Sequence, residues 1–172
     1  MKSHYDGNTN TFSNELTIYR VFWLILATMN PLTAFFSRLI FPDSVEIFWH
    51  KILLSSLLAG LFISSYFSER VRRSISGLSF ILMLLLIIQV IYLTIINRFA
   101  PLYYIGSLVF GMMIVIVFNK RLYINIYFPL AFSLLTTGAM IVPNPQINKY
   151  LIYYYNIAIF SVLYFISAMR IN

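Results

Sequence analysis

Hydrophobic residues form six long runs along the chain, and short polar or proline-containing segments separate the runs. Each run approaches the ~20 mostly apolar residues that a helix needs to cross the hydrocarbon core of a bilayer. The pattern predicts six transmembrane helices, at residues 18–41, 44–67, 74–97, 101–118, 122–141 and 148–169. The predicted fold class is therefore all-α, a polytopic membrane protein. Residues 1–17 are expected to form a polar cytosolic N-terminal tail, and residues 18–170 a six-helix transmembrane domain.

The breaks between the runs carry residues that commonly start or end helices. Asp43 is followed three residues later by Glu46, which is the spacing of an N-terminal capping box for the second helix. The segment 97–101 is a predicted turn, and its proline suits the first position of the fourth helix. Pro31 lies inside the first run, where proline favours a kink because it removes a backbone hydrogen bond.

The composition supports a membrane environment. Hydrophobic residues make up 60% of the chain and charged residues 10%, whereas soluble domains carry about 25% charged residues. So few charges could not cover a soluble surface, and lipid is therefore expected to solvate much of the molecule. The absence of cysteine excludes disulfides, thiolate metal sites and a cysteine nucleophile.

The chain carries a net charge of +7, and its basic residues lie between the apolar runs. This placement is typical of residues that set the orientation of a membrane protein, so no nucleic-acid partner is expected. Eight basic residues belong to one set of alternate connections: Lys2, Arg20, Arg70, Arg72, Arg73, Lys120, Arg121 and Arg170. Four belong to the other: Arg38, Lys51, Arg98 and Lys149. The richer side is expected in the cytosol, which places both termini there.

Groups that could perform catalysis are scarce in the sequence. It contains two histidines, His4 and His50, and lacks nucleotide-binding motifs and a Ser-His-Asp pattern. Haem and metal sites need several suitable ligands. We therefore expect no catalytic residues, no metal, no cofactor and no enzyme activity within these 172 residues.

The candidate ligand-binding residues lie at the side predicted to be extracytosolic. Glu46 and His50 are four residues apart, so on a helix they would share a face and could pair, near Arg98. Histidine titrates near neutrality, so this rim could sense a ligand or protons. The preferred interpretation is ordinary anchoring, in which the long basic side chains reach the interface.

Two further patterns concern the helices themselves. Tyr103, Tyr104 and Ser107 begin the fourth predicted helix and could line a pocket for a small ligand, or serve as interfacial aromatics and packing. A stripe of small residues recurs every four positions in the second helix and predicts close helix packing: Ser56, Gly60 and Ser64. Polar residues inside the runs are expected to hydrogen-bond across the bundle: Gln89, Asn125, Thr136, Thr137 and Asn156.

The layout resembles the N-terminal multi-helix membrane modules of bacterial sensor proteins. In these, a six-helix bundle precedes a cytosolic PAS, histidine kinase, diguanylate cyclase or class III nucleotide cyclase domain. Two segments of the sequence support the resemblance. One is the segment 97–101, which leads into Tyr103, Tyr104 and Gly106, and the other is the basic break 69–73. Leu102 stands where such relatives often carry an acidic residue. The resemblance implies a bacterial cytoplasmic (inner) membrane location and a receptor-like role in signal transduction, including two-component signalling.

The predicted function is a membrane-embedded sensor or anchoring input module that couples a signal in or near the bilayer to a cytosolic signalling domain in cis. Its expected partners are membrane lipid, a small apolar or amphipathic ligand, and a second copy in a homodimer. The alternative is a small stand-alone transporter or channel subunit, which would need a polar path across several helices. A lipid-modifying membrane enzyme would need clustered catalytic groups, which the sequence lacks.

Overall fold

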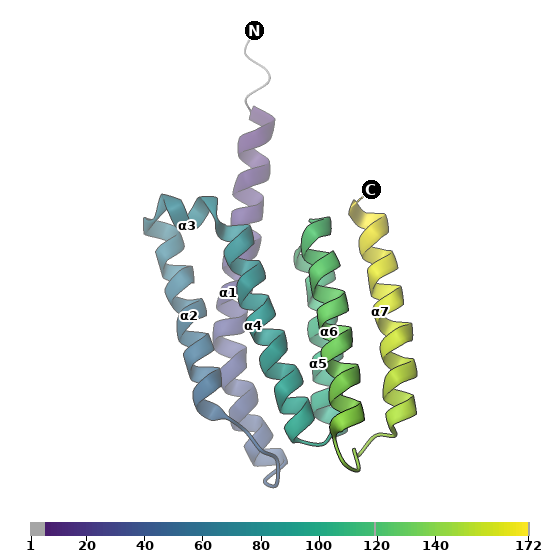
Figure 1. Ribbon diagram of the computed structural model, residues 1–172. Helices are drawn as coiled ribbons and strands as arrows, with labels where there is room; N and C mark the ends of the chain where they lie inside the picture. Colours follow the sequence, from purple (N-terminus) through teal and green to yellow (C-terminus); the bar gives the residue numbers. More distant parts are fainter. Residues whose placement is uncertain (1–5, 119, 172) are drawn as a thin grey trace. The chain divides into compact units, whose positions relative to one another are not determined.

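The computed structural model describes residues 6–118 and 120–171, and within these ranges every regular element is an α-helix (Figure 1). The helices are α1 (Asp6–Ile40), α2 (Phe48–Phe67), α3 (Glu69–Arg73), α4 (Ile75–Ile96), α5 (Pro101–Val117), α6 (Arg121–Ile141) and α7 (Lys149–Ile171). The all-α prediction is confirmed for the described chain.

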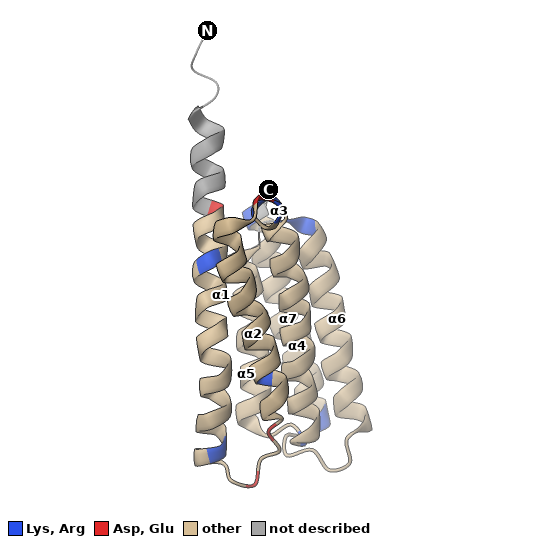
Figure 2. Ribbon diagram, turned by 90° about the vertical axis from the view of Figure 1, so that its left-hand side faces the viewer, with Lys and Arg blue, Asp and Glu red and all other residues tan. Residues whose placement is uncertain are grey.

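Five helical segments are long and apolar enough to cross a membrane: Glu15–Ile40, Phe48–Phe67, Ile75–Ile96, Arg121–Ile141 and Lys149–Arg170. The remaining predicted run, residues 101–118, forms α5, which has 17 residues and therefore a length of about 26 Å, slightly less than the ~30 Å hydrocarbon core. The chain thus has the helices of a multi-pass membrane protein. Figure 2 shows that most charged residues of the described chain lie near helix ends and connections.

The first helix starts earlier than the hydrophobic pattern predicts. It begins at Asp6 and runs without interruption through Pro31 to Ile40. Once the apolar stretch has formed a helix, adding one more residue costs little free energy, because each added residue also gains a backbone hydrogen bond. The helix therefore extends into the polar residues before the apolar stretch.

The second helix starts later than predicted, at Phe48 instead of residue 44. The amide and hydroxyl of Ser44 both donate to the carbonyl of Phe41, at 3.0 and 2.8 Å, which makes a turn. Glu46 then lies in a non-helical segment. The predicted capping box is therefore wrong, and so is the predicted helical face shared by Glu46 and His50.

The basic break forms a short helix of its own, α3. Ser68 is its N-cap, and the Ser68 hydroxyl accepts a hydrogen bond from the amide of Val71 at 3.4 Å. Glu69 and Arg73, one turn apart, form an exposed ion pair. Glu69, Arg70 and Arg73 of this break are exposed, and Arg72 is partly buried.

The described chain divides into two compact units, the first being Met1–Ile40 with Phe48–Leu82. Within it, α1 and α2 pack side by side. Arg20 of α1 donates to the hydroxyl of Ser65 at 2.8 Å and to its carbonyl at 2.6 Å, near the end of α2. The Arg20 guanidinium also lies 4.0 Å from the centre of the Tyr66 ring. Trp23, fully buried, belongs to the core of this unit.

The small-residue stripe of α2 does not make the close contact that the sequence predicts within the described chain. Ser56 and Gly60 are exposed, and a Cβ added at Gly60 would meet no heavy atom within 4 Å. The buried positions of α2 follow a different face, namely Lys51, Leu54, Ser55, Leu58 and Ser65. Contact of the stripe with a second copy stays a prediction.

The second unit comprises Phe41–Ile47 and Met83–Asn172. Its helix α7 packs beside both α5 and α6. A close glycine contact lies here, because a Cβ at Gly138 of α6 would be 2.6 Å from Cδ1 of Ile95 on α4. This unit also contains the buried polar residues described next.

Candidate functional site

A buried network of polar side chains surrounds the start of α5 in the second unit. The Tyr103 hydroxyl of α5 donates to Oε1 of Glu46, which lies in the segment 41–47, at 2.8 Å. Both residues are buried. A hydrogen bond between two buried polar groups offsets the cost of removing both from water. Glu46 and Tyr103, two predicted site residues, are therefore brought together.

Asn97 holds the same segment in place. Its Oδ1 accepts from the amide of Val45 at 2.8 Å, and its Nδ2 donates to the Val45 carbonyl at 3.0 Å. The side-chain amide thus satisfies both backbone groups of one loop residue, as a neighbouring β-strand would. The sequence placed Asn97 only in a predicted turn, because its pairing partner lies 52 positions away.

The turn between α4 and α5 has a defined geometry. The Phe99 amide donates to the Thr94 carbonyl at 2.8 Å, and the Arg98 amide donates to the Ile95 carbonyl at 3.0 Å. These are the two bonds of a Schellman motif, which places the residue after the helix in the left-handed region. Arg98 has φ 52° and Phe99 has φ 56°, a conformation that glycine adopts without strain and other residues adopt at a cost. The turn therefore depends on the surrounding contacts.

Arg98 contributes its backbone to this region. Its carbonyl accepts from the amide of Gln146 at 2.7 Å, which ties the α4–α5 turn to the α6–α7 connection. The Arg98 side chain is exposed. His50 is also exposed, and it lines a shallow surface pocket in the first unit with Trp49 and Ser56.

Tyr104, next to Tyr103, makes a second set of contacts. Its hydroxyl donates to Asn156 Oδ1 of α7 at 2.8 Å, and Asn156 Nδ2 donates to the Thr136 hydroxyl of α6 at 3.4 Å. Ser107 donates to the carbonyl of Tyr104 at 2.7 Å and so serves its own helix. Consecutive residues on a helix point ~100° apart. The start of α5 therefore contacts the segment 41–47 through Tyr103 and α7 through Tyr104.

The predicted intramembrane hydrogen bonds form only in part. Thr136 and Asn156 bridge α6 and α7, and Asn125 accepts from the Tyr164 hydroxyl at 3.1 Å. The buried amide of Gln89 makes no hydrogen bond to any residue of the described chain. A polar residue in an apolar run signals an interhelical bond, but its partner depends on how the helices are rotated.

The other end of α5 is held by the last helix. Arg170 Nη1 of α7 donates to the carbonyls of Val115 and Ile116 at 2.5 and 2.9 Å. Carbonyls in the last turn of a helix lack intrahelical partners and carry partial negative charge, so a cation satisfies them. In the sequence, Arg170 counts only toward membrane orientation, because no local pattern marks its contact with α5.

These groups hold the helices and connections of the second unit together. Among residues 6–118 and 120–171, no three His, Asp or Glu side chains lie close enough to hold a metal ion. In comparisons with known proteins, the sequence matches no family model, no curated protein and no solved structure. The resemblance to bacterial sensor modules therefore stays a prediction.

Proposed function

We propose that the chain is a membrane-embedded sensor or anchoring input module that couples a signal in or near the bilayer to a cytosolic signalling domain in cis. The observation that carries the proposal is the pair of neighbouring tyrosines on α5. Tyr103 bonds Glu46 in the segment 41–47, and Tyr104 bonds Asn156 in α7. A ligand that changed one of these bonds would rotate or shift α5 and thereby act on the other.

The contacts at the opposite end of α5 support the same role. Arg170 joins α7 to the last turn of α5, so the two helices are linked near both ends. A movement at the Tyr104 end would therefore reach the C-terminal end of α7 instead of being lost along a loose interface. Such a module works only if the ligand binds one packing state more tightly than the other.

We further propose a six-span arrangement in the bacterial cytoplasmic membrane, with both termini in the cytosol and two copies forming a homodimer. Five segments are long and apolar enough to span. The shorter α5 would cross where the bilayer thins locally, an adjustment of modest cost. The distribution of basic residues favours the cytosolic placement of both ends.

The topology is testable with reporter fusions. Fusions at Asn119 and Asn172 are expected to report the cytosol, and a fusion at Asn144 the exterior, because the basic residues alternate eight to four between the two sides. Paired reporters, one active only inside and one only outside, give the measurement. A cytosolic result at Asn144 would contradict the six-span arrangement.

The sensor role is testable by changing the helical phase at the C-terminal end. In a fusion that carries a dimeric cytosolic effector, single residues are inserted after Asn172. Because each residue turns a helix by about 100°, output is expected to change with one or two insertions and to return largely with three or four. Effector activity in membranes is the readout.

A Tyr104→Phe variant tests whether the effect of the insertions depends on the contact between α5 and α7. It removes the bond to Asn156 and is expected to weaken the response of output to insertion while the chain stays inserted. Output that ignores linker length, or declines smoothly with it, would leave only an anchoring role. Solute uptake into proteoliposomes would instead support the alternative, a transporter or channel subunit.

A further inference from the structure

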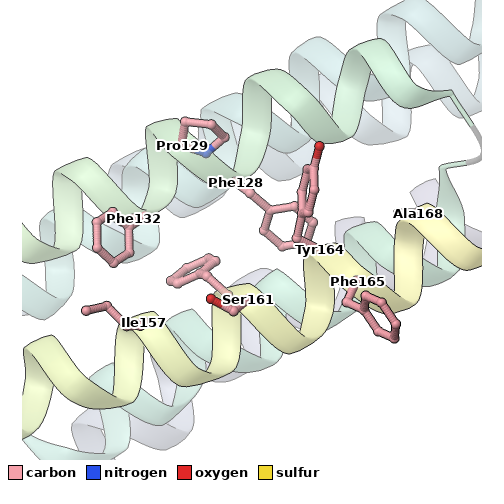
Figure 3. Close-up of a pocket in the computed structure, with 9 residues that line it drawn as sticks. Phe128, Pro129, Phe132, Ile157, Ser161, Tyr164, Phe165 and Ala168 are labelled. Atoms are coloured by element: carbon pink, nitrogen blue, oxygen red, sulfur yellow. The ribbon is translucent and has the colours of Figure 1, made fainter.

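A groove runs between α6 and α7 in the second unit, with a volume of about 500 Å³ (Figure 3). We call it the α6–α7 groove. Its floor is formed by the buried rings of Phe128 and Phe160, and Ser161 and Phe165 of α7 line it farther out. The volume lies within the ~300–1,000 Å³ typical of ligand pockets. The groove lies along two helices that are each long and apolar enough to span a membrane.

The aromatic floor is preformed. The rings of Phe128 and Phe160 meet edge to face with centroids 5.8 Å apart, and Phe132 contacts Phe160 in the same way at 6.1 Å. Tyr164 packs against Phe128 at 6.3 Å. Edge-to-face pairs of this kind are favourable and hold the rings in place. The groove can therefore accept an apolar chain without first ordering its own side chains.

A second, more polar pocket of about 260 Å³ adjoins the groove. It is lined by Arg121, Ile124 and Asn125 of α6, and it shares Tyr164 and Ala168 with the groove. The Tyr164 hydroxyl donates to Asn125 Oδ1 at 3.1 Å at this boundary. The side chain of Arg121 is exposed, so its charge is available. An apolar site and a cationic site therefore meet end to end.

The charge decides what such a site would select. Lipid tails are as apolar as the groove, so an apolar groove alone gives no preference among membrane lipids. A basic residue attracts anionic headgroups near a membrane surface. Because Arg121 opens the helix that also forms the groove, a lipid headgroup at Arg121 would have its acyl chain directed along α6.

We propose that the α6–α7 groove and the adjoining Arg121 pocket bind one anionic phospholipid, with its phosphate at Arg121 and an acyl chain against Phe128 and Phe160. This requires that α6 and α7 lie in a membrane, and it does not depend on a signalling role. A negative result in the insertion experiment would therefore not contradict the lipid site. Absence of lipid binding would likewise not contradict the sensor role.

The test uses the full chain, reconstituted with equal amounts of phosphatidylglycerol and phosphatidylcholine and then analysed by native mass spectrometry. The wild-type chain is expected to retain one phosphatidylglycerol in preference to phosphatidylcholine. Arg121→Gln should reduce this preference about fivefold, the effect of removing one basic residue at an anionic surface. Arg70→Gln removes an equal charge from α3, far along the sequence, and should leave the preference unchanged.

A groove-filling pair tests the acyl-chain site. Ser161→Phe should abolish lipid retention, while Val162→Phe, at an exposed position that does not line the groove, should not. Retention without headgroup preference, or equal effects of Arg121→Gln and Arg70→Gln, would overturn the proposal. Loss of a dimer mass in Ser161→Phe with lipid retention intact would overturn it too, because the groove would then hold a second copy of the chain.

Discussion

Replacing Gly138 by leucine is expected to destabilise the chain by about 3 kcal/mol, near the upper end of overpacking effects. A Cβ at this position would lie 2.6 Å from Cδ1 and 2.7 Å from Cγ1 of Ile95, and 3.5 Å from Cζ of Phe99. Phe99 is fully buried and sits in the strained turn before α5, so it has little room to move. The thermal unfolding midpoint of the purified chain in detergent measures the effect.

Gly60→Leu is the matched control, because it adds the same side chain to another glycine in an apolar helix. No heavy atom lies within 4 Å of a Cβ at Gly60, so the midpoint should stay near that of the wild type. A loss of stability similar to that of Gly138→Leu would show that the stripe Ser56, Gly60 and Ser64 packs against another copy. That result would favour the homodimer that the sequence predicts.

Replacing Arg170 by methionine is expected to cost about 1.5–3 kcal/mol, the range for hydrogen bonds made by a charged group. The substitution leaves the carbonyls of Val115 and Ile116 without the guanidinium that they bond. Methionine keeps much of the length and apolar character of the side chain, so the loss reports the polar contact. The unfolding midpoint in detergent gives the stability change.

Arg170→Lys provides the comparison for this prediction. Lysine keeps the charge but offers no planar group to reach two carbonyls in a fixed geometry, so it should recover only part of the stability. If Arg170→Met unfolds at the wild-type temperature, the contact between α5 and α7 contributes nothing measurable. The proposed mechanical link between the ends of α5 would then lose its basis.

Each of the two units contains an arginine that bonds backbone carbonyls of a neighbouring helix. Arg20 of α1 bonds the carbonyl of Ser65 near the end of α2, and Arg170 of α7 bonds carbonyls near the end of α5. In each case an arginine on one helix satisfies the negative end of its neighbour. Both arginines were counted on the cytosolic side by their position in the chain, so each is available for orientation and for helix packing at once.

Most helices were predictable because each depends on local information. Runs of apolar residues and the breaks between them are read directly from the chain, and five of the six predicted runs form helices long and apolar enough to span. The start of α2 was not predictable in this way. Asn97 and Tyr103 hold Val45 and Glu46 in a non-helical segment, and these partners lie more than 50 positions along the chain.

Four of the six predicted ligand-binding residues lie in the buried region around the start of α5, whereas the side chains of His50 and Arg98 are exposed. These four buried residues are Glu46, Tyr103, Tyr104 and Ser107. The sequence paired Glu46 with His50, whereas Glu46 bonds Tyr103. Asn156, which completes the network through Tyr104, was noted only as a polar residue within a run.

The sequence by itself therefore determined the helical class, the approximate spans and the polar breaks. The tertiary structure alone decided which face of each helix is buried, which glycine is closely packed and which polar groups meet. The physical reason is that lipid and protein interior are similarly apolar, so a spanning helix need not carry a polar face opposite its buried one. In α4, apolar residues cover nearly the whole surface, and its periodicity cannot mark the side that meets Gly138.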